Sequence, residues 1–201
     1  MSKFTFISIA FIFSLLLACS GNKKPADGSM QHVSDIMSKA DILKIRESAP
    51  KLIGKDWMMI TAGDNTKFNT MTASWGTLGE LWNKPVAVVF IRDHRYTYEF
   101  VENNDYFTLT FYAEKYRDAL NITGTKSGRN IDKAAEAGIT PVKTDHGIAF
   151  AEGRLVIECR KLYADFLNAD AFIEKIFINE HYPNGDYHKM YVGEIVNVWR
   201  K

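Results

Sequence analysis

The chain has 201 residues and a formal net charge of +1, from 25 Lys and Arg against 24 Asp and Glu, and it contains two cysteines. A chain so close to neutrality offers no electrostatic footprint for nucleic acid, so that class of partner is excluded. Once the leader described next is set apart, the length suits one domain with a sizeable core.

The first residues predict an export signal. Lys3 precedes an apolar run over residues 4–18, which is shorter than the roughly 20 residues needed to span a bilayer and fits a secretory leader. The run ends in Leu-Leu-Ala-Cys, which resembles a bacterial lipoprotein cleavage site. We therefore predict a signal peptide over 1–18 and a lipid on Cys19 that anchors the protein to a membrane. An ordinary signal peptide or an uncleaved anchor is the alternative.

This leader implies a location in the cell envelope, on a periplasm-facing membrane or the outer membrane. Residues 20–31 are polar and read as a flexible tether. We place the lipidated cysteine and its tether over 19–40 and a single folded domain over 41–201. With Cys19 lipidated, Cys159 has no disulfide partner. Its apolar neighbours predict a small buried hydrophobe.

In the first half of the domain, Ser48 and Pro50 predict the cap and first turn of a helix. Strands are expected over 56–61, 86–91 and 107–111. The second of these is a continuous apolar run, typical of a strand buried on both faces. The third alternates apolar residues with threonines, so that each kind occupies one face.

In the second half, helices are expected over 114–120 and 130–137, the latter capped by Asn130 and ended by Gly138. Residues 155–160 alternate as a strand does. Residues 171–179 and 187–199 read as strands on either side of Asn-Gly at 184–185, a strong hairpin signal. The inventory lacks the regular alternation of parallel α/β units. It therefore predicts a mainly β fold, an antiparallel barrel with inserted helices.

Three stretches carry residue types suited to a ligand. Residues 69–76 have small side chains that let a ligand approach the backbone, followed by the flat surface of Trp75. Residues 92–97 combine Arg95, a fork of donors for phosphate oxygens, with Thr97, expected to cap a helix whose N-terminus is an anion site. Residues 124–133 contain two glycines, hydroxyls and bases before a helix. An ordinary strand end and an exposed basic turn are the alternative readings of the first two stretches.

The order of these motifs resembles the flavin reductase-like, flavoredoxin-type FMN-binding proteins. The matching segments are Asn-Thr-Met-Thr-Ala-Ser-Trp-Gly at 69–76, Pro-Val-Ala-Val-Val-Phe-Ile-Arg at 85–92, Arg-Tyr-Thr at 95–97 and Ser-Gly-Arg-Asn-Ile-Asp-Lys at 127–133. The resemblance covers residues 52–199. It implies a split β-barrel that forms a homodimer, with one FMN per subunit near the dimer interface.

The resemblance also implies which residues bind FMN. Those facing the flavin and its ribityl chain would be Asn69, Met71, Thr72 and Ser74, with Trp75 beside the ring. Those holding the phosphate would be Arg95, Tyr96 and Thr97, with Ser127 and Lys133 contributing from the helical insert. The implied function is an oxidoreductase that passes hydride or electrons through FMN. Because the cofactor carries the chemistry, we expect no catalytic side chain.

The electron donor and acceptor are not marked by any motif. NAD(P)H or a redox protein would serve as donor, and the envelope location favours the latter because NADH and NADPH are cytoplasmic. The alternatives are a non-catalytic binding protein for flavin, haem or another planar ligand, an electron-transfer partner without a substrate of its own, and an interaction module without ligand. His181 and His188 would face each other across the expected hairpin. Without a third ligand we read them as a surface pair and predict no metal site.

Overall fold

The computed structural model describes residues 29–201. The predicted signal peptide, Cys19 and most of the tether lie outside the described residues. Within residues 29–201 no helix is long and apolar enough to cross a membrane. The strands are β1 (Ser38–Lys39), β2 (Met58–Gly63), β3 (Phe68–Ala73), β4 (Gly76–Leu81), β5 (Lys84–Arg92), β6 (Tyr106–Phe111), β7 (Pro141–Lys143), β8 (Ile148–Phe150), β9 (Leu155–Phe166) and β10 (His188–Arg200).

The main sheet runs β3-β2-β6-β9-β10-β5-β4, with every neighbouring pair antiparallel. Strands β3 and β4 are consecutive in the chain but form the two edges of this order, so the barrel is open between them. β10 pairs with β9 along its length and with β5 and then β1 on its other side. The predicted mainly β fold is confirmed.

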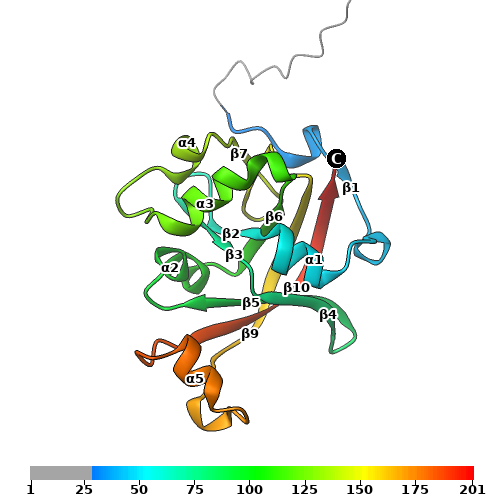
Figure 1. The fold of residues 1–201 in the computed structure, drawn as a ribbon. Coiled ribbons are helices and arrows are strands. Elements are labelled where there is room, and N and C mark those ends of the chain that lie inside the picture. Colours follow the sequence, from blue (N-terminus) through cyan, green and yellow to red (C-terminus); the bar gives the residue numbers. More distant parts are fainter. Residues whose placement is uncertain (1–28) are drawn as a thin grey trace, which may run out of the picture.

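Short helices fill the connections (Figure 1). They are α1 (Ala49–Lys51), η3 (Leu52–Asp56), α2 (Tyr96–Asn103), α3 (Arg117–Thr125), α4 (Lys133–Ala137) and α5 (Ile176–His181), with single 3₁₀ turns at Val33–Asp35, Ile42–Lys44, Glu114–Tyr116 and Ala169–Ala171. In Figure 1, α2, α3 and α4 lie on one side of the sheet, whereas α5 lies at the far end beside the start of β10.

One core cluster draws a side chain from each central strand: Ile60, Val89, Leu109, Ile157 and Tyr191. Apolar residues of α3 and α4 form a second cluster over Met59 of β2. Cys159 is fully buried, as predicted, and burial raises the pKa of its thiol. In β5, Ala87, Val89 and Ile91 on one face are buried, whereas on the other face Val86 is buried but Val88 and Phe90 are half-buried. The expectation of burial on both faces is therefore confirmed only in part.

The N-terminal boundary of the folded part differs from the prediction. The predicted tether includes residues 32–40, but Val33 and Met37 are buried against Trp199. Ser38 and Lys39 pair with the end of β10, and His32 pairs with Lys143 of β7. Although most residues of this short segment are polar, the burial of its apolar side chains holds it on the domain, so the fold begins before residue 41.

The predicted hairpin over 171–199 is wrong. The partner of β10 is β9, which ends at Phe166, and the connection contains α5 in place of a strand. Gly185 does adopt a turn conformation, with φ 70°, but this turn follows the helix.

Two helix starts also differ. Asp132, not Asn130, caps α4, by accepting from the backbone N–H groups of Ala134 and Ala135, whereas Gly138 ends the helix as predicted. Thr97 does not cap α2. The helix starts after Arg95, and Thr97 lies within its first turn. Ser48 stands at the predicted N-cap of α1, but its side chain makes no capping hydrogen bond.

Candidate functional site

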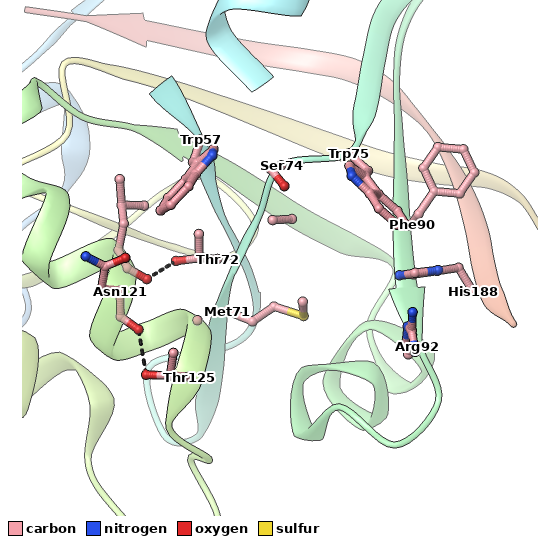
Figure 2. A pocket seen from close by; sticks show the side chains of 13 residues that line it. Trp57, Met71, Thr72, Ser74, Trp75, Phe90, Arg92, Asn121, Thr125 and His188 are labelled. Carbon is pink, nitrogen blue, oxygen red and sulfur yellow. Dashed lines mark hydrogen bonds between the residues drawn. The ribbon is translucent and has the colours of Figure 1, made fainter. Parts of the chain in front are cut away.

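A cavity of about 360 Å³ opens where the barrel is split, between the ends of β3 and β5. We call it the aromatic cavity; its lining side chains are drawn in Figure 2. Of the predicted residues, Met71, Thr72, Ser74 and Trp75 line it. The first two belong to β3 and the others to the connection that leaves the split edge, so the opening in the sheet places them together.

Strand β3 is tied to α3 beside this cavity. The hydroxyl of Thr72 donates to the carbonyl oxygen of Leu120 at 2.6 Å and lies 2.8 Å from the hydroxyl of Thr123. Its donor is therefore used within the protein, and only its oxygen can accept from a ligand. A Cβ on Gly124 would come within 3.2 Å of the Cβ of Thr72, so a glycine lets α3 approach β3 this closely.

A second cavity, of about 180 Å³, adjoins the first through Thr125, which lines both. We call it the cationic cavity, because His94, Arg95, Lys126 and Lys133 are among its lining residues. The predicted residues Tyr96, Thr97 and Ser127 also line it. It lies at the N-terminus of α2, where the helix dipole favours negative charge.

Asn69 lines neither of these two cavities but contacts Thr97, which lines the second. It is buried, and its side-chain amide donates to the hydroxyl of Thr97 at 2.8 Å. A Cβ on Gly128 would clash with the Asn69 side-chain oxygen, so a glycine lets the 126–132 loop pass here without moving Asn69. Asn69 also lines a third cavity together with Tyr96 and Lys133.

Two cations of the cationic cavity have no carboxylate partner among residues 29–201. Arg95 donates to the carbonyl oxygen of Gly124 at 2.7 Å. Lys133 is buried and donates to the carbonyl oxygens of Thr70 and Thr123, both at 2.8 Å. Burial and the nearby Arg95 lower the pKa of Lys133 to about 8, and burial together with Arg92 lowers the pKa of Arg95. Buried charges are normally paired, so this arrangement favours an anion.

The other basic side chains nearby are already paired. Arg92 is bound to Asp186, Lys126 to Glu136 and Arg129 to Glu99. Arg95 and Lys133 therefore stand apart from their neighbours as cations able to receive a ligand's charge.

His181 and His188 do not face each other across a hairpin, since His181 belongs to α5. Both instead pack on Trp75, with ring centroids 5.3 and 5.1 Å from the indole. A hydrogen bond of 2.9 Å joins Nδ1 of His188 to the hydroxyl of Tyr182. Burial and the charge of Arg92 lower the pKa of His188 to about 4, so its imidazole is neutral at pH 7. Residues 29–201 contain no group of three or more side chains able to hold a metal ion.

Several lining residues of the aromatic cavity lie outside the three stretches predicted to bind a ligand: Trp57, Phe90, Leu120, Asn121 and His188, the last of which is predicted to be one of a surface pair. Arg92, Gly124 and Thr125 lie within those stretches but are not among the predicted binding residues. Alternation along the strand places Phe90 and Arg92 on one face of β5, a signal that could have found them. Trp57 and His188 reach the cavity only through the tertiary fold, which no local pattern reveals.

The family model of the flavin reductase-like domain matches residues 52–201. A comparison with curated proteins gave no match. Among solved structures, an FMN-binding domain of a flavin reductases-like enzyme from Shewanella baltica has 15% identity and a TM-score of 0.60, covering 82% of this chain and 76% of that chain. Flavoredoxin of Desulfovibrio vulgaris has 23% identity and a TM-score of 0.57, covering 81% and 76%.

Component B of nitrilotriacetate monooxygenase from Bacillus cereus is also similar, with 17% identity and a TM-score of 0.56, covering 73% of this chain and 72% of that chain. At these identities the solved structures establish the fold, a split barrel with inserted helices. The family match extends over most of the domain, from Leu52 at the start of η3 to the last residue. The chain therefore belongs to the flavin reductase-like family.

Proposed function

We propose that the protein binds FMN and passes hydride or electrons through it. The observation that carries this proposal is the pair of cations, the half-buried Arg95 and the buried Lys133, without a carboxylate partner among residues 29–201. A phosphate group in the cationic cavity would supply the missing negative charge. The adjoining aromatic cavity offers flat side chains to a planar ring, and Thr125 lines both spaces, so one ligand with a phosphate and a ring fits the two together.

The residues divide between these two ends of the ligand. The phosphate would be held by Arg95, Thr97, Ser127, Lys133 and the N-terminus of α2, while Asn69 keeps Thr97 in place. The ring would contact Met71, Ser74 and Trp75. When bound, FMN supplies the hydride or electron transfer, and the protein supplies binding and orientation. We therefore assign no catalytic side chain.

We also propose that the protein works as a lipid-anchored homodimer in the cell envelope. The apolar leader and the cysteine at position 19 support the anchor, and the resemblance described above supports the dimer. In that location a membrane or periplasmic redox protein is the expected electron donor, with NAD(P)H as the alternative.

The test is the visible spectrum of the full-length chain purified in detergent. We expect flavin absorption bands at about 370 and 450 nm. Denaturation should release FMN, which is identified by its mass. A variant with both Arg95→Met and Lys133→Met should be isolated without FMN. A colourless protein that takes up no added FMN would refute the proposal, and a haem spectrum would support the planar-ligand alternative. Steady oxidation of NADH or NADPH would then separate a reductase from an electron carrier.

A further inference from the structure

Trp57 has a backbone conformation that tryptophan rarely adopts. It follows η3 directly, with φ 66° and ψ 165°. This region of the backbone map is almost exclusive to glycine, because a Cβ clashes there, and such conformations cluster at functional sites. A glycine at position 57 would allow the same turn without strain. The presence of tryptophan at this position therefore raises the question of what its side chain contributes.

The indole of Trp57 lines the aromatic cavity. Figure 2 shows it reaching into the cavity from the side opposite Trp75, with Ser74 between them. Trp57 directly precedes β2 and Trp75 follows β3, so both come from the open end of the β2–β3 hairpin, where Met58 pairs with Ala73. The cavity is thus bounded by flat aromatic surfaces on two sides.

Arg117 of α3 holds Trp57 from behind. Its guanidinium lies 4.4 Å from the centroid of the indole. The same group donates to the carbonyl oxygens of Asp56 at 3.2 Å and Lys55 at 3.0 Å, and it is bound to Glu114 at 2.8 Å. One arginine therefore contacts both the ring of Trp57 and the chain just before it, which restricts the movement of the ring.

We propose that Trp57 is a ring-binding residue, which stacks on the planar ring of the ligand and makes the aromatic cavity selective for such rings. This inference rests on the proposed function. It adds a residue that none of the sequence motifs contains. A flat ring is the ligand that gains most from a fixed indole, and Arg117 keeps that indole in place before the ligand arrives. The competing view is that Trp57 only fills space at the edge of the core cluster around Met59 and Leu120.

Binding of two ligands separates these views, because riboflavin has the ring of FMN without the phosphate. In Trp57→Ala we expect the affinities for FMN and riboflavin to fall together, by about tenfold, as for stacked bases on aromatic side chains. Trp57→Phe should recover most of that loss for both ligands. Trp82→Ala is the matched control, since Trp82 also has positive φ, 54°, but is exposed in the β4–β5 turn. It should bind both flavins as the unaltered protein does.

Melting temperatures test the strain separately. Trp57→Gly and Trp57→Ala both lack the indole, but only the glycine relieves the backbone. We therefore expect the glycine variant to melt higher, by about 2 °C or more, with both variants equally weak in flavin binding.

Four results would count against the inference. Unchanged affinity for both flavins in Trp57→Ala would leave the residue as core filler. A loss for FMN but not for riboflavin would place its effect on the phosphate. Equal melting of the glycine and alanine variants would remove the strain argument. Failure of the unaltered protein to bind either flavin would refute the proposed function itself, and this inference with it.

Discussion

FMN affinity should fall as the pH rises from 7 to 9, because Lys133 loses its charge in that interval. Its pKa in the ligand-free protein is lowered to about 8. About nine-tenths of the side chains are therefore charged at pH 7 and about one-tenth at pH 9. A bound phosphate dianion favours the charged lysine and raises its pKa. If the bound lysine stays charged throughout, the Kd for FMN increases about tenfold over these two pH units.

The assay is a titration of the flavin-free protein with FMN at intervals of pH, repeated with riboflavin. Titration of the phosphate itself contributes little to the change in Kd between pH 7 and 9, since its second pKa is about 6. Riboflavin reports any change at the ring and should bind equally well across the range. The variant Lys133→Met should bind FMN more weakly at pH 7, and its Kd should not vary with pH.

A Kd for FMN that stays constant from pH 7 to 9 in the unaltered protein would refute this reasoning. So would an equal pH dependence for riboflavin, since it would place the titrating group beside the ring. In either case Lys133 would be a buried structural lysine, held by Thr70 and Thr123 alone.

Two further predictions concern the ligand-free protein. Because the folded state holds the pKa of Lys133 at about 8, below the ordinary 10.5, the unfolded chain binds more protons between these values and stability rises with pH across that window. The difference in urea midpoint between the unaltered protein and Lys133→Met should therefore shift in favour of the former from pH 8 to pH 10; a constant difference would contradict this. Gly193→Ala should destabilise the barrel by about 1–3 kcal/mol, because its Cβ would lie 2.7 Å from Phe107 and 2.8 Å from Cys159, whereas Gly79→Ala, with nothing within 4 Å, is the control. Equal urea midpoints for these two variants would show that Phe107 and Cys159 can shift to accommodate the added methyl group without loss of stability.

Much of the fold could be predicted from local patterns. The apolar run at 86–91, the alternation at 107–111 and the helix end at Gly138 each follow from the chemistry of a few neighbouring residues. The failed hairpin shows the limit of such reasoning. The Asn-Gly turn is present, but β10 pairs with the long strand β9, which ends some twenty residues earlier and is buried over its first five residues. The apolar residues that resembled a strand, Ile173 and Ile176, are exposed instead.

The candidate site was predicted in its parts but not in its geometry. Small side chains, a basic turn and a glycine-containing loop are visible in the sequence, and the fold brings their residues around two joined cavities. What the sequence could not show is which cations remain unpaired, since that depends on Asp186, Glu136 and Glu99 reaching the other basic residues. The strained backbone of Trp57 was likewise invisible, because a residue type does not reveal its φ angle.

The position of β10 at the C-terminal end has a consequence for when the protein can fold during its synthesis. This last strand pairs with β9, β5 and β1. The two parts of the sheet on either side of it therefore stay unconnected until β10 has been synthesised. While the ribosome is still making the chain, the strands before it can form only an incomplete sheet with long loops left open. The complete sheet therefore forms only after β10 has been synthesised. A chain whose sheet cannot be completed before this strand is made is suited to secretion machinery that threads extended polypeptides through a membrane, as the proposed envelope location would require.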